Sequence, residues 1–221
     1  MVFELDSSLR FPDPALAEED GWLAIGGDLS VDRLKLAYEN GIFPWYSEGE
    51  PICWYSPHKR CVIFPEDIIV SKSMKGILSK KTFEIRVDSA FEKVIYSCSN
   101  STRRGQDGTW ISPEMQKAYV NMYERGFAHS VEAWQNGQLV GGLYGIAVNN
   151  VFCGESMFSH VSNASKAALI WLCREGNYLM IDCQMPTDHL FTLGAKIIDR
   201  DAYLQIIQEP PLLQNNSNVP G

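Results

Sequence analysis

The order of apolar and polar positions divides the chain into two parts that differ in texture, with the change near residue 62. Residues 1–62 are rich in glycine, proline and aromatic side chains, and they contain one clear helix pattern, VDRLKLAYEN. Ser30 can cap the start of this helix, and Asn40-Gly41 can end it. The prolines of the stretch that follows, GIFPWYSEGEPICWYSP, predict irregular turns. We therefore expect residues 1–62 to form a small N-terminal α/β domain.

Residues 63–221 carry regular helix and strand patterns instead. Three strand patterns follow one another, AHSVEAW, LVGGLYGIAV and VFCGESMF, and the Asn136-Gly137 pair between the first two is a strong hairpin signal. Helix patterns occur at SKSMKGILSKK, in a segment that Asp88 is expected to cap, after Ser112-Pro113, and at ASKAALIWLCRE. YLMIDCQ is a further strand pattern.

An antiparallel meander followed by a helix and another strand resembles the N-acetyltransferase-like (GNAT-like) fold, a likeness that carries no function by itself. We therefore predict an α+β fold in two parts. The small N-terminal domain spans 1–62, and an acetyltransferase-like catalytic domain with a mostly antiparallel sheet spans 63–221.

Composition excludes several classes of protein. The apolar fraction of 45% and the charged fraction of 21% are those of an ordinary globular protein, and no run approaches the length of a membrane span. The N-terminus does not have the pattern of a secretory signal, so we expect a cytoplasmic protein. The six cysteines form no C-x-x-C pair and no Cys/His spacing typical of zinc, which favours reduced and mostly buried thiols.

The net charge of −8 argues against a general nucleic-acid binder, although one segment is locally basic. Its cations are Lys59, Arg60, Lys72, Lys75, Lys80, Lys81 and Arg86, and Arg103 and Arg104 follow. This segment is either a solvated face or a local surface for phosphates.

Glu155 is a single carboxylate within the apolar run VFCGESMF. Burying a lone charge costs several kcal/mol or more, so such a residue needs a partner. It is either half of a structural pair, with His129 or a lysine, or a pocket carboxylate that faces a cationic ligand. Glycines crowd the neighbouring strand patterns, and glycine inside a strand often marks the close approach of a ligand or another backbone.

Asp182 and Gln184 form a second candidate site in the segment IDCQ. Two positions apart on a strand, they are expected to face the same side and to form a hydrogen-bonded pair aimed at a substrate. The amide of Gln184 is scarcely basic, but it can orient a nucleophile with Asp182 as its charged support. Asp182 could instead simply cap the next segment.

Aromatic side chains in loop-like contexts form a third group, which comprises Trp45, Trp54, Tyr55 and Trp110. Each could be core packing, or could stack on a nucleobase for about 1–3 kcal/mol per base. Their combination with the nearby lysines favours single-stranded nucleic acid or an RNA end. A loop for acetyl-CoA is not found: its nearest match begins at Gln138, fails at its last position and lies within a strand pattern.

Taken together, the motifs GGDLS, GIFPWY, WYSP, TWI, AHSVEAW, LVGGLYG, GESMFS, NASK and IDCQ resemble those of the leucyl/phenylalanyl-tRNA–protein transferase family. The resemblance covers almost the whole chain, from Phe11 to about Ile207. It implies transfer of Leu or Phe, and less readily Met, from aminoacyl-tRNA to proteins that begin with Arg or Lys, which marks them for N-end-rule degradation. It also implies that no metal or diffusible cofactor takes part.

The resemblance also implies roles for particular residues. The acyl pocket would be lined by Leu143, Phe152, Leu169, Leu172 and Ile181. Trp45 and Trp110 would hold the terminal adenosine, and Lys72, Lys75, Lys80 and Lys81 would contact tRNA phosphates. Asp182 and Gln184 would orient the attacking amine, with Glu155 near the incoming cationic acceptor. The family commonly has arginine where this chain has Lys72 and Lys75, and a lysine ammonium group does not make the bidentate phosphate contacts of arginine.

Two other classes compete with this interpretation. A small-molecule N-acyltransferase that uses a thioester would need the missing pyrophosphate loop, and a binding test with acetyl-CoA distinguishes it. A non-catalytic RNA-binding module would not need Glu155, Asp182 and Gln184 together, and a transfer assay distinguishes it.

Overall fold

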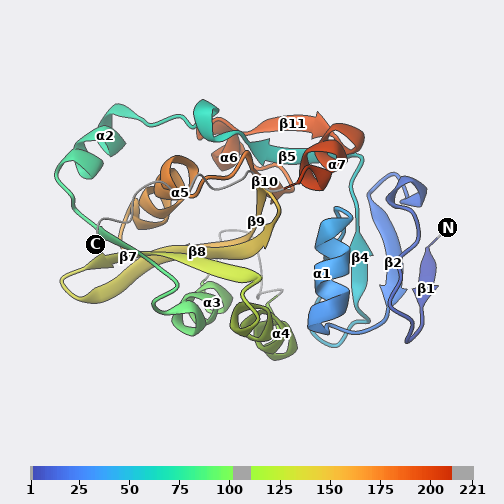
Figure 1. Cartoon of the computed structure of the whole chain (residues 1–221). Helices are drawn as coiled ribbons and strands as arrows, with labels where there is room; N and C mark the ends of the chain where they lie inside the picture. Colours follow the sequence, from blue (N-terminus) through green and yellow to red (C-terminus); the bar gives the residue numbers. More distant parts are fainter. Residues whose placement is uncertain (1, 102–110, 211–221) are drawn as a thin grey trace, which may run out of the picture.

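The computed structural model describes residues 2–101 and 111–210 (Figure 1). Within these residues the strands form a four-stranded sheet near the N-terminus and a seven-stranded sheet built from the rest of the chain. The chain passes from one sheet to the other between β4 (Cys53–Tyr55) and β5 (Lys59–Ile63). How the chain divides into domains at 62 remains a prediction.

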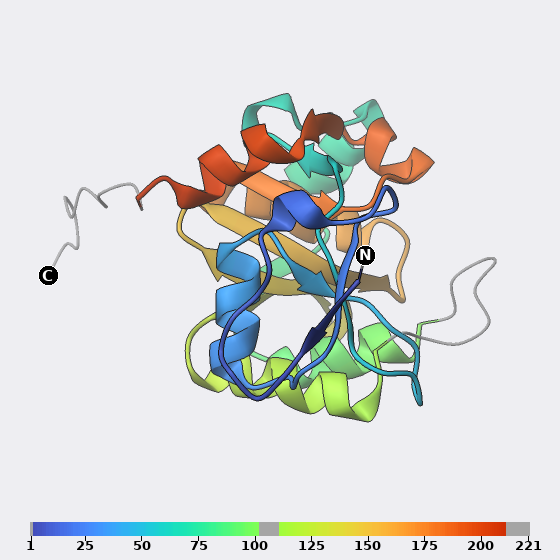
Figure 2. The ribbon, with the colours of Figure 1, turned by 90° about the vertical axis from the view of Figure 1, so that its right-hand side faces the viewer.

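The small sheet has the strand order β1-β2-β4-β3. Its strands besides β4 are β1 (Phe3–Leu5), β2 (Trp22–Gly26) and β3 (Phe43–Pro44). Helix α1 (Val31–Glu39) connects β2 to β3, and the Ser30 side chain accepts a hydrogen bond from the backbone of Arg33, as the predicted N-cap should. Helix α1 lies between this sheet and the large one (Figure 1), and Figure 2 shows the molecule from the side of the small sheet.

The large sheet has the order β11-β5-β10-β9-β8-β7-β6. Its remaining strands are β6 (Glu84–Val87), β7 (Ala128–Gln135), β8 (Gln138–Val148), β9 (Val151–Ser159), β10 (Met180–Gln184) and β11 (Lys196–Asp199). Only the β9–β10 neighbours are parallel in this sheet. The predicted α+β class, with a mostly antiparallel sheet and the Asn136-Gly137 hairpin, is therefore confirmed.

Helices cover both faces of the large sheet (Figure 1). Helices α3 (Phe91–Ser99) and α4 (Pro113–Glu124) pack on the face that also meets α1, whereas α5 (Ala164–Glu175) and α2 (Lys72–Ser79) lie over the other face. Helix α6 (Asp188–Thr192) precedes β11, and α7 (Arg200–Gln208) packs on β5 and β11. Two short 3₁₀ helices, Pro14–Leu16 and Pro65–Asp67, complete the elements of the described residues.

Two local predictions need correction or a different explanation. Asp88 does not cap α3, because its carboxylate accepts hydrogen bonds from the Ser130 backbone and lies against His129, while the backbone of Ala90 donates to Glu132 from β7. The glycines of β8 answer packing needs rather than a ligand. A Cβ at Gly141 would lie 2.5 Å from the Cβ of Ala164 in α5, so this glycine lets the helix approach the sheet.

Candidate active site

The candidate site lies where two parallel strands separate. Strands β9 and β10 pair only as far as Cys153 and Asp182. Beyond that point β9 stays paired with β8, whereas β10 shifts register against β5 and ends at Gln184. The separation leaves a cavity of about 600 Å³ that side chains of both strands can reach.

This cavity has an apolar part and a polar part. The apolar part includes the five residues predicted for the acyl pocket: Leu143, Phe152, Leu169, Leu172 and Ile181. The polar part includes Glu155, Asp182 and Gln184, and Phe43, Pro44 and Trp45 contribute from β3 and the residue after it. The fold thus brings these predicted residues, which are distant in sequence, to one cavity, while their individual roles stay predictions.

Glu155 is buried, with 8% of its surface exposed, and it is held by neutral donors. Its Oε1 accepts hydrogen bonds from the Tyr38 hydroxyl at 2.7 Å and from Gln184 Nε2 at 2.7 Å, and its Oε2 accepts one from the Tyr119 hydroxyl at 2.8 Å. The two tyrosine oxygens also lie 2.5 Å apart. The suggested structural partner His129 is wrong, since that imidazole lies against Asp88.

The β9 backbone aims Glu155 at these partners. In the β8–β9 ladder Tyr144 pairs with Ser156 and Gly145 pairs with Gly154, which leaves Glu155 as the extra residue of a bulge. Bulges interrupt the alternation of a strand and re-aim a side chain. Gly145 belongs to this feature, because a Cβ there would lie 2.2 Å from the Cys153 carbonyl oxygen.

Burial raises the pKa of Glu155 to about 7, and the negative charge of Asp182 adds to that effect. The hydrogen bonds from Tyr38, Tyr119 and Gln184 act in the opposite direction, because they stabilise the ionised form. Glu155 is therefore a carboxylate that changes charge near neutral pH beside an open cavity. A perturbed group in a cleft is a candidate functional group.

Asp182 is also fully buried, but a cation neutralises it. Arg60 on β5 donates from Nε to Oδ1 at 3.0 Å and from Nη2 to Oδ2 at 2.7 Å, and the Tyr203 hydroxyl donates to Oδ2 at 3.0 Å. Arg60 therefore does not belong to the basic surface segment in which the sequence placed it. Lys59 pairs with Asp199, and Arg86 pairs with Glu84, so neither of these cations is free either.

Gln184 does not form the predicted side-chain pair with Asp182. Asp182 Oδ1 accepts a hydrogen bond from the backbone N–H of Gln184 at 2.8 Å, and the Gln184 backbone has a φ of 60°. This left-handed residue lies at the shift in the β10–β5 register. Because Gln184 Nε2 donates to Glu155, its Oε1 is the atom left to accept a hydrogen bond from a bound group.

The donor side of the predicted site is described only in part. Trp45 lines the cavity with 42% of its surface exposed and meets the Tyr55 ring edge-on at a centroid distance of 5.6 Å. The indole is thus anchored yet accessible. The other predicted platform, Trp110, and the cations Arg103 and Arg104 lie outside the described residues.

The predicted tRNA-binding lysines lie away from the cavity, on or just after α2. Lys72, Lys75, Lys80 and Lys81 are all exposed, and none of them lines the cavity. Their helix carries its apolar side, which includes Met74, toward the sheet. A contact with phosphates at some distance from the acyl group remains a prediction for these residues.

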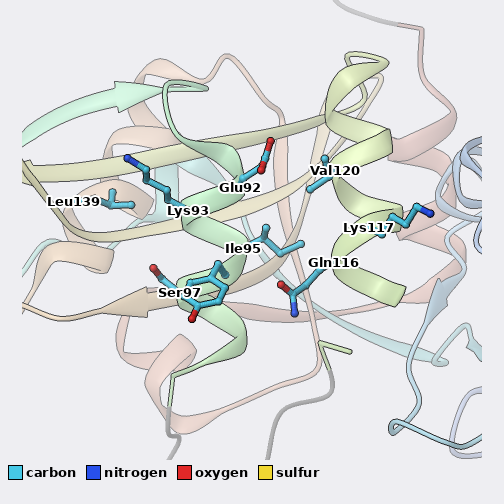
Figure 3. Close-up of a pocket in the computed structure, with 9 residues that line it drawn as sticks. Glu92, Lys93, Ile95, Ser97, Gln116, Lys117, Val120 and Leu139 are labelled. Carbon is cyan, nitrogen blue, oxygen red and sulfur yellow. The ribbon is translucent and has the colours of Figure 1, made fainter. Parts of the chain in front are cut away.

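A second cavity, of about 580 Å³, lies between α3 and α4, on the face of the large sheet that these helices cover (Figure 3). Charged and polar side chains surround it, among them Glu92, Lys93, Gln116 and Lys117. None of the residues predicted for the site lines it. It has no buried carboxylate or amide that could act on a bound group, so the cavity between β9 and β10 is the better candidate.

Three further features of residues 2–101 and 111–210 are the state of the cysteines, the clustering of possible metal ligands and the length of the helices. The six cysteines are free, and four of them are buried. No cluster of three or more His, Cys, Asp or Glu side chains in this range could hold a metal ion. None of the helices described there has the length and apolar character needed to cross a bilayer.

Fold and site together define a class of protein: an α+β protein whose cavity has an apolar end and, beside it, a carboxylate–amide pair. The chain belongs to the leucyl/phenylalanyl-tRNA protein transferase family. The family model matches residues 62–208, and the model of the family's N-terminal domain matches residues 27–58.

Curated relatives are similar over nearly the full length. The leucyl/phenylalanyl-tRNA–protein transferase of Flavobacterium johnsoniae is 50% identical and aligns with 94% of this chain and 99% of its own. That of Syntrophus aciditrophicus is 50% identical over 97% of this chain and 92% of its own, and that of Pseudomonas fluorescens is 50% identical over 89% of each.

Likeness to solved structures is weak. A GCN5-related N-acetyltransferase from Kribbella flavida has a TM-score of 0.39 at 14% identity, over 79% of this chain and 64% of its own. A conserved protein of unknown function from Bacteroides thetaiotaomicron has a TM-score of 0.46 at 11% identity, over 68% and 55%.

Sequence reasoning missed the contacts of four side chains at the site: Tyr38, Tyr119, Arg60 and Tyr203. The sequence places Tyr38 in the helix pattern VDRLKLAYEN and Arg60 in a locally basic segment. A local pattern does not show that the tyrosine hydroxyl and the guanidinium end beside buried carboxylates. The one available signal was the need of Glu155 for partners.

Proposed function

We propose that this protein transfers a leucyl or phenylalanyl group, and less readily a methionyl group, from aminoacyl-tRNA to the N-terminal Arg or Lys of an acceptor protein. The observation that carries the proposal is the cavity in which an apolar pocket adjoins the Glu155–Gln184 pair. Family membership supports the same reaction. The modified protein would then be a substrate for N-end-rule degradation in the cytoplasm.

The donor would enter with its side chain in the apolar part of the cavity. Leu143, Leu169 and Leu172 offer aliphatic contacts, and Phe152 and Ile181 complete the wall. An apolar pocket of this kind accepts Leu and Phe and excludes charged side chains, because an unpaired charge is costly to bury. The terminal adenosine would stack on Trp45 at the rim, and the exposed lysines of α2 would contact phosphates further along the tRNA.

The chemistry is the aminolysis of an ester. The neutral α-amine of the acceptor attacks the aminoacyl carbonyl carbon, the bond from that carbon to the ribose oxygen breaks, and the nitrogen gives up a proton as the ribose oxygen gains one. The reference pKa of an α-amine, near 7.7–8.0, leaves a usable neutral fraction at pH 7. Holding the two reactants together would supply much of the rate.

Gln184 would accept a hydrogen bond from the attacking amine through Oε1. Glu155 holds the amide in that orientation, and in its ionised form it attracts the cationic acceptor. Asp182 acts one step further away, because it holds the Gln184 backbone rather than its amide. No metal or cofactor is required for these steps.

The test is to mix the protein with radiolabelled Leu-tRNA and a peptide that begins with Arg, and to measure label in the peptide. The matched control is the same peptide with an acetylated N-terminus, which has no free amine and should gain no label. Label in both peptides would contradict transfer to the α-amine. No label in either peptide, with binding of acetyl-CoA instead, would favour a thioester-dependent acyltransferase.

A further inference from the structure

Arg60 lies beneath the candidate site and contacts both the end of β10 and the segment that leads to the cavity rim. Arg60 is 1% exposed, and each of the three nitrogens of its guanidinium donates a hydrogen bond. Nε and Nη2 both donate to Asp182, and Nη1 donates to the carbonyl oxygen of Gly41 at 3.0 Å. The aromatic rings of Phe43 and Tyr203 lie over its central carbon, with centroids at 4.7 Å and 4.5 Å.

The first of these contacts leads to the amide of Gln184. Arg60 fixes both oxygens of Asp182, and Asp182 Oδ1 in turn accepts the hydrogen bond from the Gln184 backbone. Gln184 has a left-handed φ of 60°, which a residue with a side chain adopts only when its surroundings hold it there. Removing the guanidinium therefore loosens the segment that aims the Gln184 side chain into the cavity.

The second contact leads to the opposite wall. Gly41 lies in the turn after α1, and two positions later Phe43 begins the segment Phe43, Pro44 and Trp45 along the cavity rim. Arg60 holds Gly41 by its carbonyl and Phe43 by stacking. One buried side chain thus fixes the distance between the rim that carries Trp45 and the strand end that carries Gln184.

Only a guanidinium can make these contacts at the same time. Its planar fork binds both oxygens of a carboxylate and still has a free edge for a third acceptor, whereas an ammonium group is a single point of charge. A buried ion pair adds little to stability compared with apolar residues of the same shape. The arrangement is thus better explained by geometry than by stability.

We propose that Arg60 is a positioning residue of the transfer reaction, which holds the Asp182–Gln184 strand end in register with the Trp45 rim. The inference rests on the proposed function, because the reaction whose rate it sets is aminoacyl transfer. Arg60 touches neither substrate. Its effect is on the rate of the transfer step and not on the affinity for either substrate.

The test compares Arg60→Lys with the wild-type protein in the transfer assay, with tRNA and peptide each varied to saturation. We expect kcat to fall on the order of a hundredfold, as a displacement of about 1 Å at a reacting group does. The KM for each substrate should stay within roughly threefold, since uniform binding is retained. Filter binding of tRNA should be unchanged, which separates this role from a phosphate contact.

Arg33→Lys is the matched control. Arg33 is also 1% exposed, but its guanidinium bonds to Asp28 and to the backbone of Asp6 in the N-terminal part, away from the cavity. It should lower the thermal midpoint, by less than Arg60→Lys does because the side chain of Asp28 is about half exposed, and should leave kcat near the wild-type value. Should Arg60→Lys fail to fold, Tyr203→Phe removes one donor to Asp182 and should lower kcat several-fold at constant KM.

A double variant gives the sharpest result. If Arg60 acts through Asp182, Arg60→Lys combined with Asp182→Asn should transfer no more slowly than the slower single variant. Multiplied effects, a wild-type kcat in Arg60→Lys and Tyr203→Phe, or a loss of tRNA affinity alone would overturn the inference while wild-type transfer still supports the proposed function. Absence of transfer by the wild-type protein would overturn both.

Discussion

The large sheet carries two buried glutamates, Glu132 on β7 and Glu155 on β9. Both accept hydrogen bonds from neutral groups of the protein, but they lie in different parts of the sheet. Glu132 is fully buried and accepts hydrogen bonds from the Ala90 backbone, Ser130, Trp134 and Ser89. Glu155 accepts its hydrogen bonds from two tyrosines and Gln184. Neither has a cation within ion-pair distance in the described part of the chain.

The charges around the two carboxylates differ in sign. Glu132 lies at the start of α3, where the helix dipole favours an anion, and it also interacts with the charge of Arg86. Glu155 has the buried Asp182 as its charged neighbour, which helps to raise its pKa. Glu132 lines neither cavity, whereas Glu155 faces one. We therefore propose that Glu132 is structural and that Glu155 takes part in the reaction, because only Glu155 combines an anionic neighbour with an open cavity.

The largest expected effect comes from exchanging each carboxylate for its neutral isostere. Glu155→Gln should lower the transfer rate about a hundredfold, because it removes the charge that faces the acceptor and disturbs the amide of Gln184. Glu132→Gln should instead cost about 2 kcal/mol of unfolding free energy, because it weakens charge-assisted hydrogen bonds, and should leave the rate per folded molecule unchanged. Transfer kinetics and urea unfolding of both variants check this contrast. The comparison fails if both variants lose stability and neither loses rate.

A somewhat smaller effect on transfer is expected from enlarging a side chain in the apolar wall of the cavity. Leu143→Trp fills the apolar part of the cavity, so transfer of Leu and Phe should lose about 1–3 kcal/mol of transition-state binding. The measurement is kcat/KM for Leu-tRNA and Phe-tRNA, with the thermal midpoint as the control for folding. Normal transfer of both groups would mean that other side chains hold the acyl chain.

The pH dependence of stability should reflect the titration of Glu155. Burial raises the folded-state pKa of Glu155 to about 7, from 4.5 for an ordinary glutamate, so protonation favours the folded state. Its contribution to stability is fully present below the unfolded value and is lost as pH rises through about 7. Glu155→Gln should remove this loss and become more stable relative to wild type above that pH.

The same titration should appear in the reaction rate. The proposed reaction uses an ionised Glu155 and a neutral amine. Below the pKa of about 7, log(kcat/KM) of the wild-type protein should therefore rise by two per pH unit. In Glu155→Gln the slope should be one, because only the amine titrates. A slope of one in both proteins would show that Glu155 does not need its charge.

Much of the fold followed from local patterns, because hairpin turns and helix caps are local features. The Asn136-Gly137 turn and the cap at Ser30 are where the sequence predicted them. The site was predictable only as far as chemistry demanded it: a lone carboxylate in an apolar strand needs partners. Its partners are remote, since Tyr38 lies 117 positions from Glu155, and Arg60 lies 122 positions from Asp182.

The bulge at Glu155 in β9 and the register shift at Gln184 in β10 could not be predicted from the sequence for a related reason. Strict alternation predicts Asp182 and Gln184 on one face, yet the register shift and the left-handed Gln184 send one side chain to Arg60 and the other to Glu155. A bulge depends on the neighbouring strand as well as on its own residues. Its position therefore has to come from the assembled sheet.

The smallest expected effect concerns the two faces of the sheet rather than the two glutamates. Helix α2 carries Lys72 and Lys75 on one face, and Lys93 and Lys117 lie beside the second cavity on the other (Figures 1 and 3). All four are exposed, so the pairs are matched in charge and in accessibility.

If tRNA lies along the α2 face, changing Lys72 and Lys75 to Ala should weaken tRNA binding several-fold. The slope of log affinity against log salt should also become shallower by about one to two, because fewer counterions are released on binding when two phosphate contacts are lost. Turnover at saturating tRNA should stay nearly intact, since neither lysine reaches the cavity. Changing Lys93 and Lys117 to Ala alters the net charge equally and should leave the slope unchanged. An equal loss for both pairs would mean that overall charge, rather than a surface on α2, governs the association.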